Sequence, residues 1–348
     1  MAFYFSFLVK PNLKSIIEPN RTVGTIIMII CLLMWVPFFL QPDIKQTISP
    51  NEYLNFRNSI AINKFWALSI TLLLSIFNGF LISTFIYLLR ITKERSVFPI
   101  CLYLLFIINV PGLNTQFETQ LSLLIFIMAI YLFHKIYKIK TPVEEVFQIT
   151  LLLSFGTWIM PESFLLFPIL LIFLISQKKL SLRIFSSIII GIIVAASFLF
   201  IYFYYSNTWN DFVLYARILF IVNSNSIALF THFSLKDILF LLFFMIGLLS
   251  IAYYFTLSFL HTYHIRSTIN NFTTIFLILA PFILLKINTF ENLTVLWFAV
   301  LCTLSTNLFV QKTNWFCYIL FHLYIIVQLA YYALQFLPYE NWINIPYC

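Results

Sequence analysis

Charged residues are scarce in this sequence. Of its 348 residues, 9% are Asp, Glu, Lys or Arg, whereas 62% are hydrophobic and 20% are aromatic. The mean hydropathy is +0.98, and a soluble domain with a solvated surface cannot have this composition. The net charge is +8, but the Lys and Arg residues form no basic run, which argues against nucleic acid as a partner. The sequence therefore predicts an integral membrane protein whose solvent is the lipid bilayer.

Glycine is also scarce, with six residues, and the common nucleotide and metal motifs are missing. There is no P-loop, no GxGxxG turn, no HExxH and no CxxC. No polar segment is long enough to form a nucleotide-binding domain. The energy for any work would therefore come from an ion gradient, a partner or an activated substrate in the membrane. We expect no metal centre; the cofactor is unknown, and a divalent cation held by carboxylates stays open.

The five cysteines give no disulfide or redox pattern. Four of them fall in apolar segments: Cys31, Cys101, Cys302 and Cys317. In such segments a cysteine usually acts as a small buried hydrophobic residue. Cys348 stands alone near the C-terminus and has no partner for an internal disulfide.

Long apolar runs are what the sequence has in abundance. They predict eleven membrane-spanning helices, at about residues 22–40, 65–89, 97–110, 119–134, 146–160, 163–177, 184–204, 238–260, 272–285, 292–310 and 315–336. Several are shorter than the roughly 20 residues that a perpendicular helix needs, so we expect local thinning of the bilayer or partial insertion. The expected fold is all-α, a single polytopic transmembrane bundle over residues 1–348.

The basic residues sort to one side of these spans. With the N-terminus in the cytoplasm, most Lys and Arg residues lie inside. Six fall outside: Lys45, Arg57, Lys64, Arg217, Lys236 and Lys286. This asymmetry predicts a multi-pass protein of the cell inner membrane, with the N-terminus inside and the C-terminus outside.

Pro161 and Glu162 interrupt an otherwise apolar run between Val146 and Ser176. Basic clusters precede and follow this run, and both clusters belong inside, so an even number of crossings must lie between them. A single helix of this length, at about 1.5 Å per residue, would also exceed a hydrocarbon core of about 30 Å unless strongly tilted. We therefore expect an external hairpin turn at Pro161 and Glu162, between two short helices or a re-entrant pair.

The two longest loops, about 41–64 and 205–237, are both external in this topology. Within the second, the segment WNDFVLYARILFIV at 209–222 has the length and composition of a helix lying in the membrane interface. Such a helix could simply cover the bundle. Alternatively, Arg217 binds a lipid phosphate, because a guanidinium group matches phosphate geometry. Arg57 in the first loop is the second candidate for this role.

Three external acids lie near the membrane surface, namely Asp43, Glu118 and Glu162. Carboxylates there could act as a general base toward an acceptor hydroxyl, or hold a divalent cation against a phosphate. The alternative is that they are ordinary solvated loop charges. Within the spans, His322 is the one strongly ionisable residue near mid-membrane, and Asn78 is polar but neutral. Such residues mark functional sites or interhelical hydrogen bonds.

The chain resembles a family of uncharacterised multi-spanning inner-membrane proteins found in Bacteroidetes. The likeness covers most of the chain, and it is a pattern of helix hairpins rather than an invariant motif. It rests on three segments, FNGFLISTFIYLL, VFPICLYLLFIINVPGL and EEVFQITLLLSFGTWIMPESFLLFPILLIFLISQKKLSLRIFSSIIIGIIVAASF. The resemblance implies a multi-pass membrane protein and brings no activity with it.

A second resemblance is architectural. Eleven spans, the same orientation and an acid soon after the first span resemble the GT-C glycosyltransferases, such as the protein O-mannosyltransferases. This implies that Asp43 serves as base or metal contact and that the donor is a polyprenyl-phosphate-linked sugar. The chain departs from that pattern, because it has only PDI at this position, without a paired acidic motif, and no soluble external domain.

Three functions remain open. A GT-C-like transferase, acting on the outer face in envelope glycan or protein glycosylation, predicts that the external acids and Arg217 converge on one cavity open to the bilayer. An accessory or assembly component of a cell-envelope complex predicts an exposed surface for other envelope proteins. A lipid or solute transporter predicts a midplane cavity near Asn78 or His322.

Overall fold

The computed structural model describes residues 28–40, 64–89, 91, 96–110, 117–137, 139–206, 235–257, 263–284, 293–311 and 315–334. These residues form helices and no strand, so the predicted all-α class is confirmed. The elements are α3 (Val36–Leu40), α5 (Lys64–Leu88), α6 (Phe98–Asn109), α7 (Phe117–Ile136), α8 (Val143–Ile159), the 3-10 helix η1 (Pro161–Leu165), α9 (Leu166–Ser176), α10 (Leu182–Tyr205), α12 (Leu235–Leu257), α13 (Tyr263–Leu284), α14 (Thr294–Gln311) and α15 (Trp315–Leu334). Each predicted apolar run corresponds to one of the α-helices.

Four of these helices are long and apolar enough to cross a membrane, within Phe65–Leu88, Phe117–Ile136, Leu182–Tyr205 and Leu239–Thr256. Several shorter apolar helices accompany them. Large apolar side chains are exposed along the outer helices, as at Ile193 in α10. Such a surface suits a helix that faces lipid, because its side chains contact hydrocarbon while its backbone hydrogen bonds form within the helix. The protein is therefore a polytopic membrane protein in contact with the bilayer.

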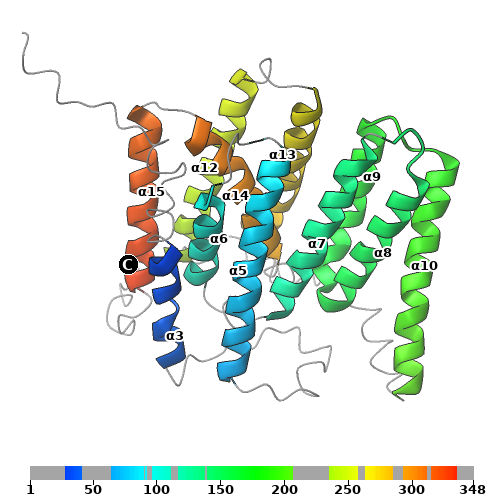
Figure 1. Ribbon diagram of the computed structural model, residues 1–348, viewed down its shortest axis with the longest axis horizontal. Coiled ribbons are helices and arrows are strands. Elements are labelled where there is room, and N and C mark those ends of the chain that lie inside the picture. The colour runs from blue at the N-terminus through cyan, green and yellow to red at the C-terminus, as the bar shows by residue number, and fades with distance from the viewer. Residues whose placement is uncertain are drawn as a thin grey trace, which may run out of the picture.

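The helices stand side by side and alternate in direction (Figure 1). The first and last described helices are neighbours, since the Tyr332 hydroxyl donates to the Met34 carbonyl oxygen at 2.6 Å. At the other side of the molecule α8 packs between α7 and α10. Helix α7 connects this outer group to the rest of the bundle through α5.

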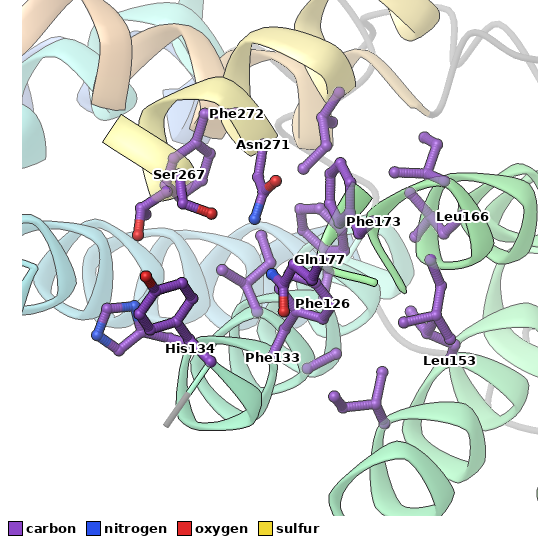
Figure 2. A pocket seen from close by; sticks show the side chains of 18 of the residues that line it. Phe126, Phe133, His134, Leu153, Leu166, Phe173, Gln177, Ser267, Asn271 and Phe272 are labelled. Atoms are coloured by element: carbon purple, nitrogen blue, oxygen red, sulfur yellow. The ribbon is translucent and has the colours of Figure 1, made fainter. Parts of the chain in front are cut away.

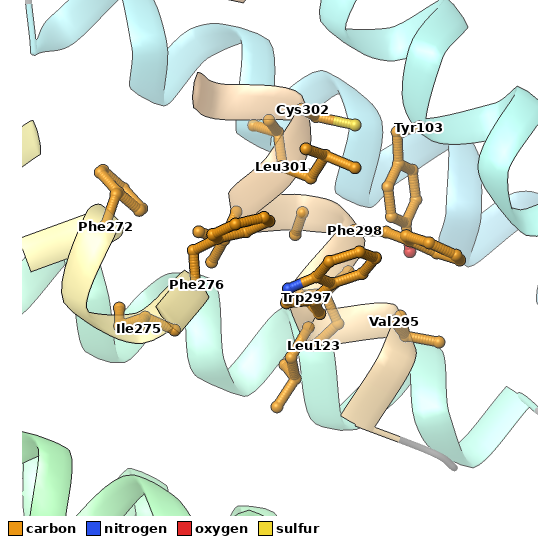
Figure 3. Close-up of a cluster of buried hydrophobic side chains, with 14 of the residues drawn as sticks. Tyr103, Leu123, Phe272, Ile275, Phe276, Val295, Trp297, Phe298, Leu301 and Cys302 are labelled. Atoms are coloured by element: carbon orange, nitrogen blue, oxygen red, sulfur yellow. The ribbon is translucent and has the colours of Figure 1, made fainter. Parts of the chain in front are cut away.

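Helices α6 and α14 form the centre of the bundle. Every residue of α6 is buried, and aromatic rings pack around α14, with Phe298 4.9 Å from Phe106 and Trp297 5.1 Å from Phe276 between ring centroids (Figure 3). The 12 residues of α6 extend about 18 Å, well short of a hydrocarbon core of about 30 Å. Protein rather than lipid covers this short helix, so its length need not match the bilayer.

The hairpin expected at Pro161 and Glu162 is confirmed. Helix α8 ends at Ile159, and η1 turns the chain into α9. After α9, the Lys179 ammonium donates to the carbonyl oxygens of Tyr137 at 3.0 Å and Ile139 at 2.8 Å, and also to that of Ile136. These carbonyls lie at the end of α7, just before α8 begins. The chain therefore returns after α9 to the end from which α8 started.

Candidate functional site

Three of the five predicted site residues, Asp43, Arg57 and Arg217, lie outside the described residues. The same holds for the expected interfacial helix at 209–222 and for nearly all of the two long loops. The roles assigned to these residues stay predictions. The structure describes the other two candidates, Glu118 and Glu162.

Glu118 and Glu162 lie at the same end of the bundle. Glu118 is in the first turn of α7, and Ser122 follows it by about one helical turn. The Ser122 hydroxyl is 3.2 Å from that of Ser163, the neighbour of Glu162. Glu162 itself is only 6% exposed. Its interpretation as a solvated loop charge is therefore wrong, because the hairpin turn packs against α7.

Neither of these acids belongs to a metal centre in the part of the chain that the structure describes. There, no three His, Cys, Asp or Glu side chains lie close enough together to hold a metal ion. A carboxylate from the loops outside the described ranges could complete a cation site, so the divalent cation stays an open prediction.

Asn78, expected to mark a transport cavity, belongs instead to a closed polar cluster. It is fully buried, and its Nδ2 donates to the backbone oxygen of Gln120 at 2.8 Å and to Oε1 of Gln120 at 3.3 Å. The Tyr103 hydroxyl donates to the same Oε1 at 2.5 Å. The cluster joins α5, α6 and α7 by hydrogen bonds. His322 is half-buried, with its ring 5.5 Å from that of Phe321, and neither His322 nor Asn78 lines the cavity found elsewhere.

That cavity lies between the outer helices α7, α8 and α9 on one side and α13 on the other (Figure 2). Its space is about 650 Å³ when the open solvent at its mouth is included. Most of its wall is apolar. Phe126 and Phe133 from α7, Leu153 from α8, and Leu166 and Phe173 from α9 are typical of this wall.

Polar side chains gather at one end of the cavity. They are His134 and Tyr137 at the end of α7, Gln177 just after α9, and Ser267, Thr268 and Asn271 near the start of α13. We call these six residues the polar mouth. Figure 2 shows Asn271 and Gln177 pointing into the same space from opposite sides, with Leu153 and Leu166 further along the cavity. The cavity is therefore amphiphilic, polar at one end and apolar along its length.

Gln177 carries a buried amide group at this mouth. Its Oε1 is buried and has no hydrogen-bond partner in the part of the chain that the structure describes. The oxygen and nitrogen of such an amide can be exchanged without changing its shape. In the orientation that the structure has, the buried oxygen is unpaired, which costs free energy unless a ligand supplies a partner.

Among the described residues, no Asp, Glu, Lys or Arg side chain lines the cavity. Charges of both signs border its mouth, with Lys135, Lys178 and Arg266 exposed at this end of their helices and two acids in the first turn of α8. Lys179 is nearby, but its ammonium already donates to backbone carbonyls. Burial lowers the pKa of Lys179. The polar mouth is therefore a neutral, hydrogen-bonding surface.

The span predicted from the sequence begins at residue 272, so it leaves out the polar residues of this site. Helix α13 begins at Tyr263 instead. In a helix, residues four apart lie on one face, so Ser267, Asn271 and Ile275 share the face that lines the cavity. This helical spacing, polar at first and then apolar, is a signal that the sequence does contain.

Comparisons of this chain with protein-family models, with curated proteins and with solved structures find no match. The resemblances to a Bacteroidetes membrane family and to the GT-C glycosyltransferases therefore stay predictions from the sequence. The geometry of the cavity and of the two acids carries the functional inference.

Proposed function

We propose that this protein binds an amphiphilic lipid in the cavity between α7, α9 and α13. The apolar chain lies along Phe126, Phe133 and Phe173, and the head group occupies the polar mouth. The single observation that carries this proposal is the polarity of the cavity, which is apolar along its length and polar at one end. A membrane lipid has the same arrangement.

The head group should decide which lipid binds. A chain that enters the cavity leaves one hydrocarbon environment for another, so it gains little of the hydrophobic free energy that drives burial from water. Hydrogen bonds at the polar mouth differ between lipids, however, because each head group offers different donors and acceptors. Selectivity therefore resides in residues such as Gln177 and Asn271.

We also propose that the polar mouth faces the cytoplasmic side of the membrane. In the inner membrane, with the N-terminus in the cytoplasm, the ends of α7 and α9 face the cytoplasm, and so does the start of α13. The polar mouth then lies at the depth of the inner-leaflet head groups. The bound lipid is accordingly one that the inner leaflet supplies.

The test fills the cavity. Ala129 is 3% exposed and lines the cavity, whereas its neighbour Met128 is 51% exposed on the outer face of α7. We expect Ala129→Phe to reduce photolabelling of α7 and α9 by a lipid with a diazirine in its chain, in reconstituted nanodiscs. Met128→Phe is the matched control and should leave this labelling unchanged. Equal labelling of both variants would contradict the proposal, provided that their thermal stabilities match.

A lipid-linked transferase on the opposite face is the second candidate function. It is supported by the approach of Glu118 and Glu162 at one end of the bundle, through Ser122 and Ser163. In this hypothesis Asp43 acts as base, Arg217 or Arg57 binds the phosphate, and the donor is a polyprenyl-phosphate-linked sugar. Asp43→Asn should then lower transfer from a labelled donor by roughly 10²-fold or more in reconstituted membranes. Unchanged transfer in both Asp43→Asn and Arg217→Ala would remove these assignments.

Passage of a solute is less well supported than binding. A transport path needs polar groups along its whole length, whereas this cavity is polar at one end only. A role in assembly of an envelope complex would use an exposed face such as that of α10, which is apolar and packs against α8 alone among its major contacts. Lipid would cover that face equally well, so it gives no specific support.

A further inference from the structure

We infer that the head group bound at the polar mouth carries free hydroxyl groups, as a glycerol or sugar head group does. This inference rests on the proposed function, because it names the class of lipid that the cavity selects. It follows from the kinds of hydrogen-bonding groups that line the mouth and from the kinds that do not.

The residues of the mouth can both donate and accept hydrogen bonds. Gln177 and Asn271 present amides, and Ser267 presents a hydroxyl. A ligand hydroxyl also donates and accepts, so it can pair with an amide in either orientation. The buried Oε1 of Gln177, which has no partner in the described part of the chain, needs a donor of this kind. A fully ionised phosphate offers acceptors only, so it can pair with an amide nitrogen but not with this oxygen.

Other head groups fit the same wall less well. A phosphate clamp usually relies on Arg or Lys, but no Arg or Lys side chain is among the described residues that line the cavity. Lys179, the cation held beside it, is already engaged by the carbonyl oxygens of Tyr137 and Ile139. A quaternary ammonium group is usually held by an aromatic cage or a carboxylate. The described mouth has Tyr137 and His134 but no carboxylate, and its other four side chains are amides and hydroxyls. An uncharged polyol matches this wall best.

The inference is tested by competition between head groups on identical chains. The full-length protein is placed in phosphatidylcholine nanodiscs and labelled with chain-diazirine analogues of three lipids: monoglucosyl diacylglycerol, phosphatidylglycerol and phosphatidylcholine. The first head group carries hydroxyls and no phosphate, the second carries hydroxyls and a phosphate, and the third carries a phosphate and a quaternary ammonium but no hydroxyl. We expect the two hydroxylated lipids to label the cavity about tenfold more strongly than phosphatidylcholine, since a buried polar group left unpaired is costly.

Two matched pairs of variants assign this preference to the mouth. Gln177→Met and Asn271→Leu keep side-chain volume and should abolish the preference. Gln148→Met and Asn270→Leu should keep it, because Gln148 and Asn270 are exposed and outside the cavity. Leucine at position 270 also serves as the folding control for leucine at position 271.

The outcomes separate this inference from the proposed function. Equal labelling of the cavity by all three lipids would overturn the hydroxyl preference and leave lipid binding intact. Preference for phosphatidylglycerol alone would assign recognition to the net negative charge of its head group and also overturn the hydroxyl preference. Labelling confined to outer faces such as that of α10 would overturn the proposed function itself.

Discussion

Two glutamines, the fully buried Gln120 and the half-buried Gln177, show how differently this bundle uses the same side chain. Gln120 is fully buried, and its Oε1 accepts hydrogen bonds from Asn78 and Tyr103. Gln177 presents a buried amide oxygen to the cavity and has no partner for it in the described part of the chain. The first glutamine holds three helices together, whereas the second is suited to bind a ligand. The role of a polar side chain in this bundle therefore depends on whether the neighbouring helices pack against it or leave space beside it.

The packing of the helices explains this difference. Around Gln120, α5 packs closely against both α6 and α7. Around Gln177, α9 and α13 touch along little of their length, and the space between them is the cavity. We call the region around Gln120 the closed region, and we include in it the neighbouring packing of α12, α13 and α14. We call the region around Gln177 the open region. The closed region should resist substitution, and the open region should tolerate it.

The largest effect is expected where the closed region has no space. A Cβ atom at Gly247 in α12 would lie 2.1 Å from the Phe276 ring, and that ring packs against Trp297 at 5.1 Å. Gly247→Leu should therefore destabilise the protein by about 3 kcal/mol, measured by unfolding in mixed micelles with increasing SDS. Met245→Leu is the control, since Met245 is 55% exposed and should change stability little. A stable Gly247→Leu protein would show that α12 and α13 are not packed as described.

A smaller effect is expected for the polar cluster. Gln120→Leu keeps the side-chain volume but leaves the Tyr103 hydroxyl without its acceptor. We expect a loss of about 1–2 kcal/mol in the free energy of unfolding, the usual range for interhelical hydrogen bonds in membranes. The same measurement on Tyr103→Phe and on the double variant completes a double-mutant cycle. Additive losses in the double variant would mean that the two side chains do not interact.

The smallest effect on stability is expected in the open region. Gln177→Met removes an amide whose oxygen has no partner in the described part of the chain, so the free energy of unfolding should change by less than about 0.5 kcal/mol. Lipid selectivity should nevertheless be lost. If Gln177→Met instead destabilises the protein as much as Gln120→Leu, then Gln177 is a structural residue and the contrast between the two glutamines fails.

Hydropathy and charge were enough to predict the helices and the hairpin at Pro161. A helix in lipid must be apolar over most of its length, so the spans are visible in the sequence. The burial of Glu162 was not predicted, because it depends on the packing of the hairpin turn against α7. The short apolar run of α6 suggested a thinned bilayer or partial insertion. A helix that is covered by protein, however, need not match the thickness of the bilayer.

The candidate site was harder to predict than the fold. Its residues come from α7, α9 and α13, and only the bundle brings them together. The helical spacing of Ser267, Asn271 and Ile275 is visible in the sequence, but it does not reveal which helix faces them. The predicted external site, with Asp43, Arg57 and Arg217, lies outside the described residues, and it stays a separate prediction for the opposite end of the bundle.

The most direct test of lipid binding compares two photoactivatable probes of the same lipid, one with its diazirine beside the head group and one at the end of the chain. In nanodiscs, followed by mass spectrometry of labelled peptides, we expect the head-group probe to label residues near Gln177 and Asn271. The chain-end probe should label residues near Phe126 and Leu166. Labelling of the same residues by both probes, or of the outer face of α10 alone, would contradict a lipid held in this orientation.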